Sequence, residues 1–307
     1  MGWSMGDDQF DLLAGWLYQH AAQPVLFKLG LIGLDELAFD AVTFFLYGLA
    51  QILLIYMIVR PLEALLPSEK WTSRKGTRAD VVYTLLNRLG LIPLLLFFLL
   101  MPVTSGLDEW LRLHNLLPRE LEHLSPWLLA NPLPSFALYL LVIDLGNYWQ
   151  HRLQHKLGIW WKLHSLHHSQ KMLSFWSDDR NHIVDDVIGW VWFAVVTAAI
   201  GVPPAQFVWL VAAGRAVESL SHANVRFGFG AVGERLLVSP KFHRQHHSLA
   251  AGQKGCNFAT LFPIWDVLFG TADFENAAAA TGVNPEDDYP DGYLAQQWVG
   301  VKRLLGR

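Results

Sequence analysis

Four apolar stretches divide the chain, and each is a candidate for a membrane-spanning helix. They are residues 41–59, 89–103, 133–143 and 187–210. A span needs about 20 apolar residues, so the second stretch either extends back through Asn87 and Arg88 or forms half of a hairpin. The third becomes long enough if its helix continues to Trp149. Pro203 and Pro204 interrupt the fourth, which predicts two joined helices, and about four membrane segments are expected in all.

Positive charge is distributed unequally between the loops that join these stretches. Six Lys or Arg residues lie between Arg60 and Arg88, whereas residues 104–132 contain only two. By the positive-inside rule the first of these loops is cytoplasmic, which places the end of the third stretch and the following region on the same side. The first forty residues carry six acidic residues, and no cleaved signal peptide is expected.

The composition agrees with a membrane protein and limits its chemistry. Hydrophobic residues make up 52% of the chain and charged residues 16%. The net charge of −4 and the absence of a basic run argue against nucleic acid as a main partner. Cys256 is the single cysteine, so an internal disulfide and a four-thiolate metal site within the chain are excluded. Any metal must be held by imidazole and oxygen.

Ten of the thirteen histidines lie between residues 151 and 247. Eight of these form three clusters: His151 and His155; His164, His167 and His168; His243, His246 and His247. Residues three or four apart on a helix are neighbours, so each cluster can direct several ring nitrogens towards a common point. Eight imidazoles suit two metal ions with four or five ligands each, and both iron and zinc accept imidazole. The pattern predicts a dimetal site and leaves the metal open.

The position of the clusters, directly after apolar stretches, predicts a lipid substrate. An activated water on zinc could hydrolyse a lipid ester, whereas attack on an unactivated C–H bond needs a redox metal and dioxygen. A membrane metal carrier is a third hypothesis, but it would require histidines or carboxylates repeated within the spans. Only Asp144 is of this kind.

The clusters and their surroundings resemble the fatty acid hydroxylase and sterol desaturase superfamily, membrane enzymes with a histidine-rich diiron centre. Residues 144–155 (DLGNYWQHRLQH), 163–169 (LHSLHHS) and 239–247 (SPKFHRQHH) resemble the three boxes of the family, and Asn257 with residues 265–271 (WDVLFGT) resembles its closing segment. Several boxes in the same order make the resemblance specific. It covers residues 137–273.

The resemblance implies ten iron ligands and three further site residues. The ligands are the eight clustered histidines with His182, in Arg180-Asn-His182, and His222, in Ser221-His222-Ala-Asn224. Some relatives have another histidine four residues before His222, where this chain has Glu218. That carboxyl is either a ligand or, the favoured interpretation, an acceptor for an imidazole N–H. Asp144 is expected to orient a ligand histidine, or else to bond to a neighbouring helix; Asn257 completes the candidate catalytic residues. Asp266 could act like Asp144 or cap a helix.

The sequence therefore predicts an all-α, polytopic membrane protein with about four transmembrane segments and a cytosolic helical cap that carries the metal site. Its expected parts are an N-terminal region (1–132), a histidine-box catalytic domain (133–273) and a C-terminal tail (274–307). The resemblance implies two iron ions, O2 as co-substrate, and hydroxylation or desaturation of a lipid.

Electrons must come from a separate reductase, ferredoxin or cytochrome b5-like protein. The chain shows no haem-binding module, and Gly228–Gly233 lacks the strand that a dinucleotide-binding loop requires. The alternatives are a zinc-dependent membrane lipid hydrolase and an inactive relative that serves as a scaffold.

Overall fold

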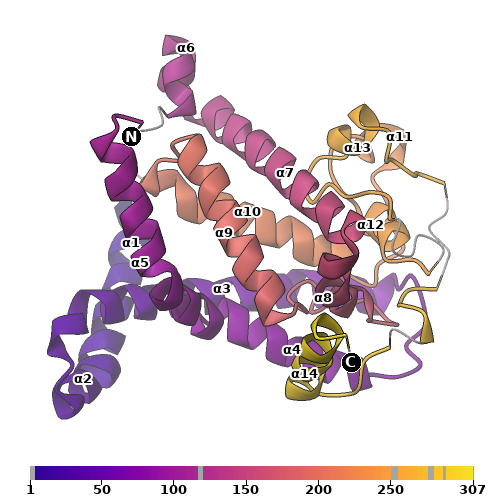
Figure 1. Ribbon diagram of the computed structural model, residues 1–307, viewed down its shortest axis with the longest axis horizontal. Coiled ribbons are helices and arrows are strands. Elements are labelled where there is room, and N and C mark those ends of the chain that lie inside the picture. Colours follow the sequence, from indigo (N-terminus) through magenta and orange to yellow (C-terminus); the bar gives the residue numbers. More distant parts are fainter. Residues whose placement is uncertain (1–3, 117–119, 250–254, 276–279, 286–287, 307) are drawn as a thin grey trace.

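The computed structural model describes residues 4–116, 120–249, 255–275, 280–285 and 288–306 (Figure 1). Within these ranges the regular elements are helical, and the β interaction is an isolated bridge between Ser248 and Thr281. The prediction of an all-α fold is confirmed.

The described helices occur throughout the chain, and the longest connections lie after α8, α12 and α13. In chain order they are α1 (Ser4–Leu17), α2 (Gln23–Leu29), α3 (Asp35–Leu65), α4 (Lys75–Arg88), α5 (Leu91–Leu113), α6 (Pro126–Ala130), α7 (Pro132–Lys156), α8 (Gly158–His168), α9 (Ile183–Ala199), α10 (Pro204–His222), α11 (Gly230–Gly233), α12 (Pro240–His246), α13 (Ile264–Leu268) and α14 (Tyr293–Leu304). A π-helical turn (Tyr18–Ala22) joins α1 to α2, and 3-10 turns precede α3 (Ile32–Leu34) and α6 (Leu121–Leu124).

Two helices in the described ranges, α3 and α5, are long and apolar enough to cross a membrane. The second apolar stretch does not extend back through Asn87 and Arg88. Instead, α4 ends at Arg88, and Gly90 separates it from α5 with a left-handed backbone (φ 95°). Because α5 continues forward to Leu113, it reaches the length of a span in the other direction.

The third and fourth apolar stretches fold as their sequences predict. α7 runs without a break from its apolar first half to His151 and His155. The fourth stretch is divided into α9 and α10, and Pro204 opens α10 at a position where the missing N–H of proline costs nothing. In this way α7 and α10 deliver histidines at their C-terminal ends.

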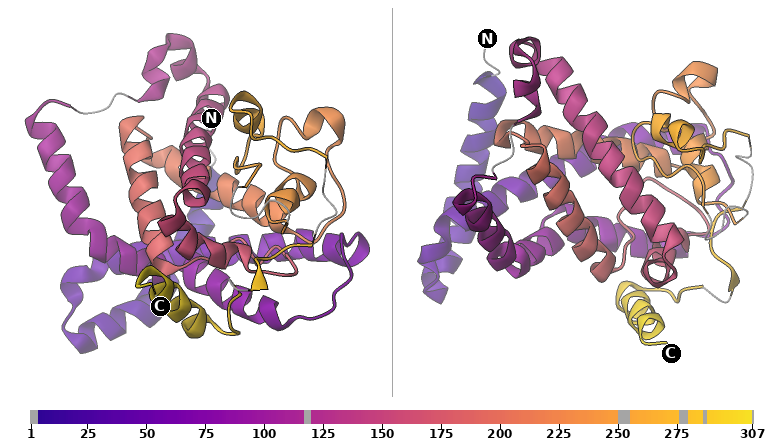
Figure 2. Two further views of the ribbon diagram at one scale, coloured as in Figure 1. Left: turned by 45° about the vertical axis from the view of Figure 1, so that its right-hand side comes forward. Right: turned by 45° about the horizontal axis from the view of Figure 1, so that its top comes forward.

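The histidine-bearing helices meet at one end of the molecule. α7 packs against α8, α9 and α10, while α10 also contacts α3 and α12. Figure 1 shows α8, α12, α13 and α14 gathered around the C-terminal end of α7; these helices and the segments joining them are called the cap below. The right-hand view of Figure 2 separates the cap from the N-terminal helices.

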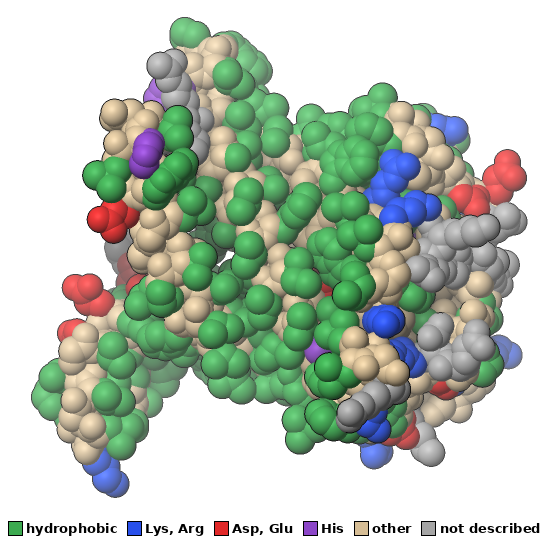
Figure 3. Space-filling model, in the orientation of Figure 1, with side chains coloured by type: hydrophobic (Ala, Val, Ile, Leu, Met, Phe, Trp, Pro, Cys, Tyr) green, Lys and Arg blue, Asp and Glu red, His purple; other side chains and the backbone are tan. Residues whose placement is uncertain are grey.

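Apolar side chains cover much of the surface outside the cap, whereas Lys and Arg gather over the cap (Figure 3). On α9, Val184, Val191 and Val195 form an exposed stripe along one face, with exposed fractions of 36%, 42% and 54%. On α5 the exposed residues include Leu95, Leu99 and Val103. Large exposed apolar surfaces of this kind are typical of contact with lipid. An open apolar cavity of about 360 Å³ also lies between α2, α3 and α5.

Buried ion pairs attach α4 to the segment that follows α8. The Arg180 guanidinium donates to Asp80 at 2.6 Å, and both side chains are buried. Arg88 pairs in the same way with Asp178 and Asp179, so its side chain points into the protein rather than towards lipid headgroups. Each charge has a partner because an unpaired buried charge is very costly. These pairs fix the segment between α8 and α9, which supports the metal site.

The Arg180–Asp80 pair provides a test of this interpretation. Asp80→Asn leaves the Arg180 charge buried without its counterion, so unfolding in detergent should require about 3–5 kcal/mol less free energy. Lys171→Ala is the control, because the Lys171–Asp288 pair is exposed and should contribute less than about 1 kcal/mol. Equal effects of the two substitutions would contradict the structural role of the buried pair.

Candidate metal centre

Nine of the ten predicted histidine ligands come together in two adjacent groups. The first group consists of His151, His155, His164, His168 and His246, and the second of His167, His222, His243 and His247. Within each group the candidate ligand atoms lie within 4.8 Å of one another, and all nine residues are buried. The two groups have the composition of two neighbouring metal sites.

The helices distribute each histidine cluster between the groups. On α8, His164 and His168 are one turn apart and face the first group, whereas His167 faces the second. On α12 the assignment is reversed: His246 joins the first group, while His243 and the following His247 join the second. On a helix, residue i+4 lies nearly above residue i, whereas residue i+3 is rotated further from it around the helix axis. The His-x2-His-His spacing thus connects the two groups twice.

The ring nitrogens converge at distances that suit a shared cation. The Nε2–Nε2 distances are 3.1 Å for His155–His168, 3.2 Å for His167–His222, 3.0 Å for His222–His243 and 3.1 Å for His243–His247. A metal bound at about 2.1 Å from each nitrogen separates neighbouring ligand atoms by about 3.0–3.4 Å. The observed spacing is therefore that of ligands around a metal ion.

Main-chain carbonyl groups orient two histidines of the first group. The Nδ1–H of His151 donates to the carbonyl oxygen of Phe258 at 2.8 Å, and that of His246 donates to Cys256 at 2.6 Å. A proton fixed on Nδ1 leaves Nε2 unprotonated and able to bind a metal. Both Nε2 atoms are buried and have no hydrogen-bond partner in the structure. Since an unsatisfied buried polar atom costs about 1–3 kcal/mol, these residues fit a bound metal ion.

Asp185, in the first turn of α9, orients a third histidine of this group. Its Oδ2 atom lies 3.1 Å from Nδ1 of His164, while its Oδ1 atom accepts from Gln154 and Trp160 at 2.9 and 2.6 Å. The Nε2 atom of His164 is buried and unpaired, as in the two histidines above. Asp185 was not among the residues predicted from the sequence, although an acidic residue in the first turn of a helix, three positions after His182, was a visible signal.

The second group has less support around it. Only His222 has a described acceptor, the main-chain carbonyl oxygen of Glu218 at 2.8 Å from Nδ1. In His167, His243 and His247, Nδ1 is buried without a partner in the structure. Outer hydrogen bonds fix the ring orientation of a ligand and raise its basicity. The two groups therefore differ both in the number of imidazoles and in how firmly the rings are held.

The Glu218 carboxyl is part of neither group. It lies instead among the charges of Asp178, Arg215 and Arg88. The favoured expectation, an acceptor for an imidazole N–H, holds for the main-chain oxygen of this residue and not for its side chain. The same bond would form with any residue at this position, because α10 provides it through its backbone.

Asp144 does not contact a histidine, which corrects the expectation of a direct bond. Its carboxylate accepts the backbone N–H groups of Thr260, Leu261 and Phe262 at 3.2, 2.8 and 2.8 Å. The Asp266 carboxylate accepts the backbone N–H groups of Phe258 and Ala259, each at 2.8 Å. Five consecutive amides, residues 258–262, are thus held by two carboxylates. Asp144 acts on His151 indirectly, through the segment that contains the Phe258 carbonyl group.

Asn257 is buried, and its side chain bonds to main-chain atoms of α12 and of the segment that follows α13. Its side-chain amide donates to the carbonyl oxygens of Phe242 and Asp273 at 3.0 and 2.8 Å and accepts the Asp273 N–H at 2.6 Å. Its backbone is left-handed (φ 56°), which asparagine tolerates better than most residues. Asn257 therefore fixes α12, which carries His243 and His246, rather than facing the ring nitrogens.

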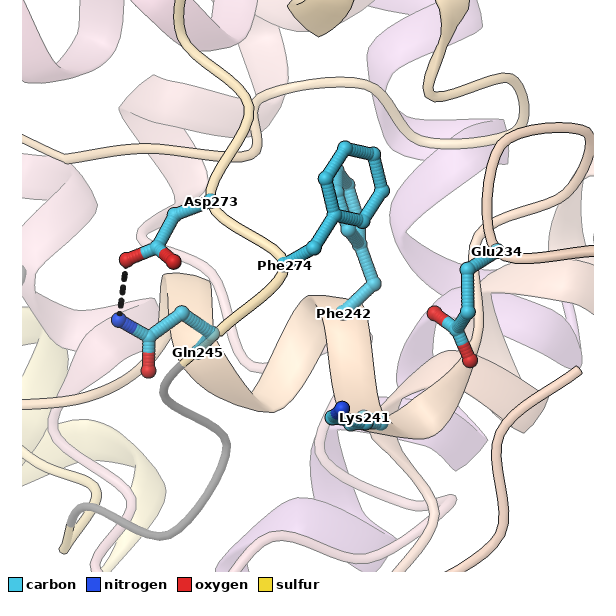
Figure 4. Close-up of a pocket in the computed structure, with 6 residues that line it drawn as sticks. All are labelled: Glu234, Lys241, Phe242, Gln245, Asp273 and Phe274. Carbon is cyan, nitrogen blue, oxygen red and sulfur yellow. Dashed lines mark hydrogen bonds between the residues drawn. The ribbon is translucent and has the colours of Figure 1, made fainter. Parts of the chain in front are cut away.

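The outer face of α12 is fixed as well. Figure 4 shows a pocket of about 10 Å³ there, lined by Glu234, Lys241, Phe242, Gln245, Asp273 and Phe274. The Gln245 amide donates to Asp273 at 2.9 Å. The pocket is the size of one water molecule, so it cannot hold a lipid, and its polar contacts serve to attach α12 to the segment after α13.

His182 lies outside both groups, which corrects its assignment as a ligand. Its Nδ1 atom accepts the Val184 N–H at 3.1 Å and caps α9, and its Nε2–H donates to the carbonyl oxygen of Gln297 at 2.9 Å. Both ring nitrogens are thus used in hydrogen bonds. The Arg180-Asn-His182 motif gave no indication that the His182 side chain caps the first turn of a helix.

Residues 136–271 match the sequence model of the fatty acid hydroxylase family. The chain thus contains a fatty acid hydroxylase domain. The matched region contains all nine histidines of the two groups together with Asp144, Asp185 and Asp266, in agreement with the resemblance of the histidine boxes.

Proteins similar to this chain have names that refer to the oxidation of lipids or sterols. Ornithine lipid hydroxylase OlsE of Rhizobium tropici is 28% identical over 261 residues, which cover 81% of this chain and 76% of that protein. Alkylglycerol monooxygenase of Homo sapiens is 28% identical over 61% of this chain and 39% of its own length. Methylsterol monooxygenase 1-3 of Arabidopsis thaliana is 28% identical over 46% of this chain and 50% of its own. No solved structure matches the chain significantly.

Burial favours the neutral form of seven of the grouped histidines. Desolvation, followed by neighbouring imidazoles, lowers the pKa well below 6.5 for His151, His167, His168, His243 and His247. Desolvation also lowers the pKa of His222 to about 4 and that of His246 to about 3. At neutral pH these rings offer lone pairs to a metal ion without first losing a proton.

The lowered pKa values predict acid sensitivity of the metal-free protein. Between pH 6.5 and about 4 the unfolded chain takes up protons that the folded state excludes, so stability must fall as the pH falls. Each such histidine contributes up to about 1.4 kcal/mol per pH unit below its unfolded pKa. Unfolding of metal-free protein in detergent, measured from pH 8 to 5, should show this loss. A constant stability across the range would contradict the buried, neutral state.

The arrangement of Asp144 predicts a local effect on hydrogen exchange. Asp144→Leu removes the acceptor of three backbone N–H groups, and amides 260–262 should exchange faster with deuterium than in the parent. Amides 258 and 259, which Asp266 holds, are the internal control and should change less. Equal acceleration across residues 258–262 would mean that the two carboxylates do not act on separate amides.

Proposed function

We propose that the protein is a membrane-bound diiron monooxygenase that hydroxylates a C–H position of a lipid with O2 and externally supplied electrons. The observation that carries this proposal is the pair of adjacent, buried groups of imidazoles whose ring nitrogens converge. Their nitrogens satisfy the ligand number of two metal ions, and hydroxylation of a C–H bond needs a redox metal. The names of the relatives, hydroxylase and monooxygenase, support iron over zinc.

One iron ion in each group would be held by the nine histidines, with His182 outside the site. The bound irons supply the activation of dioxygen. The protein holds the irons, fixes the tautomer of their ligands through the Phe258 and Cys256 carbonyl groups and Asp185, and keeps water away. In this scheme Asp144, Asp266 and Asn257 position the site and do not contact the reacting atoms.

Aromatic rings close the first group against water. The Trp161 ring packs against His155 and His168, with centroids 4.9 and 5.3 Å apart. Phe258 is fully buried and packs against His151, His155 and His246 at centroid distances of 5.2–5.9 Å. Exclusion of water strengthens electrostatic interactions within the site and prevents side reactions.

The substrate proposed first is a membrane lipid with an amino-acid headgroup. The similarity to the ornithine lipid hydroxylase extends over more of this chain than that to the alkylglycerol or methylsterol monooxygenases. An ether lipid is the second substrate to examine. Electrons come from a separate reductase, ferredoxin or cytochrome b5-like protein, and desaturation is the alternative outcome of the same C–H attack.

The proposed topology has four membrane segments: α3, α5, the first half of α7, and the pair α9 and α10. The basic loop between α3 and α5 supports a cytoplasmic position for the cap and its metal site. Residues 1–132 then form the N-terminal membrane region and residues 133–273 the catalytic domain, followed by residues 274–307.

Metal analysis of detergent-purified protein tests this function. The parent should contain about two irons per chain, and a variant with His167→Ala and His246→Ala, one substitution in each group, should lose most of them. His182→Asn is the matched control: asparagine preserves a helix cap and removes a ring that binds no metal, so the iron content should remain. Loss of iron in this control would show that the His182 ring contributes to the site, either as a ligand or through its bond to Gln297.

The same preparations distinguish the oxygenase from the hydrolase. Incubation with candidate lipids, a reductant system and ¹⁸O2 should give a product that carries one labelled oxygen atom. Two zinc ions per chain at full occupancy in iron-replete cells, with release of a fatty acid and no label from O2, would instead identify a zinc-dependent lipid hydrolase.

A further inference from the structure

The C-terminal helix α14 has an exposed apolar stripe on one face. Leu294, Trp298, Val301 and Leu305 repeat at intervals of four, three and four residues, and three of them have exposed fractions of 57–79%. This repeat places them on one side of the helix. The inner face of α14 packs against α8 and buries Gln296 and Gly300. The apolar face of α14 therefore points out of the protein.

The stripe is bordered by positive charge and continues into a surface already assigned to lipid. α14 contains no acidic residue and carries the exposed Lys302 beside the stripe, whereas Arg303 faces inward and donates to Ser165. The adjacent α8 contains Lys162 and no acidic residue. The exposed valines of α9 begin at Val184, next to Ile183, whose N–H donates to the Gln297 side chain at 2.8 Å. α14 thus crosses the end of α9 at the point where this helix leaves the proposed membrane segment.

We propose that α14 lies along the cytoplasmic surface of the membrane, with its apolar stripe among the acyl chains and Lys302 at anionic headgroups. A helix with this division between apolar and cationic faces binds in the plane of a lipid interface, and tryptophan is enriched at that depth. The inference rests on the membrane placement of the proposed function and adds to it a second contact with lipid, beside the metal centre.

The contact reaches the metal centre through the start of α9. The main-chain oxygen of Gln297 accepts the His182 Nε2–H, and its side-chain amide donates to Asn181 and to Tyr83 at 2.9 and 3.1 Å. One turn further along α9, Asp185 orients His164. α14 therefore holds the helix turn that aligns a histidine of the first group, so lipid docking of α14 supports the alignment of that imidazole.

Spin labels on α14 test this placement in the full chain. Nitroxides would be attached at Trp298→Cys and Leu294→Cys, on the stripe, and at Ala295→Cys, which is exposed and lies away from it. The native Cys256 needs no replacement, because burial raises its thiol pKa to about 12 and leaves it unreactive at neutral pH. The parent chain is the labelling control. Each iron-loaded variant would be placed in nanodiscs of phosphatidylcholine and phosphatidylglycerol.

The expected result is a several-fold higher ratio of O2 to nickel-chelate accessibility at positions 294 and 298 than at position 295, because O2 concentrates in lipid and the chelate remains in water. Equal ratios at the three positions would show that the stripe faces water. Protection of 294 and 298 from both reagents would show that protein, for example a second copy, covers it. Either result overturns the inference.

The iron content of the same samples separates this inference from the proposed function. Iron-loaded protein in which the stripe faces water would leave the diiron proposal standing and exclude the docking of α14. Protein that binds no iron while its stripe lies in lipid would support the docking of α14 and contradict the diiron proposal.

Discussion

Nine buried imidazoles directed at one another inside the protein are the constraint on which the rest of this structure depends. Each ring with its proton on Nδ1 presents an unshared electron pair on Nε2, and several of these pairs lie 3.0–3.2 Å apart. Without a cation such contacts repel, and burial has removed the water that would relieve them. The fold must hold the rings in place against this repulsion, and a bound metal changes it into attraction.

The polar architecture of the cap meets this requirement. Histidines from α7, α8, α10 and α12 are held by carbonyl groups of the backbone and by Asp185, and the segments that supply these acceptors are themselves fixed by buried carboxylates and by Asn257. Such a core is built from hydrogen bonds to a greater extent than an apolar one. It specifies ring orientation, which apolar packing alone does not, because each acceptor selects one tautomer.

The sequence predicted the helices and the grouping of the histidines more closely than the connections between them. Apolar length and proline positions predicted α7 and the division into α9 and α10, and histidine spacing predicted nine of the grouped residues. The histidine spacing could not show that His167 joins a different group from His164 and His168. Nor could it show that His246 joins a different group from His243 and His247. Both assignments depend on how α8 and α12 face each other. It also gave no indication of the Phe258 and Cys256 carbonyl groups, because every residue carries one. His182 was misassigned because a capping imidazole and a ligand imidazole look alike in a motif.

Residues 293–304, expected to lie in a tail, form α14 because Gln296, Gln297 and Gly300 fit surfaces that exist only in the folded protein.

The two carboxylates that hold residues 258–262 also determine how the centre responds to motion. Asp144 is part of α7, and the segment it binds returns through Phe258 to His151 on the same helix. Helix, loop and ligand therefore form a closed ring of bonds. A displacement of α7 moves the imidazole and its acceptor together, so the angle between them is preserved when the apolar first half of the helix shifts. A lipid that pushes on α7 would move this part of the centre as one rigid body.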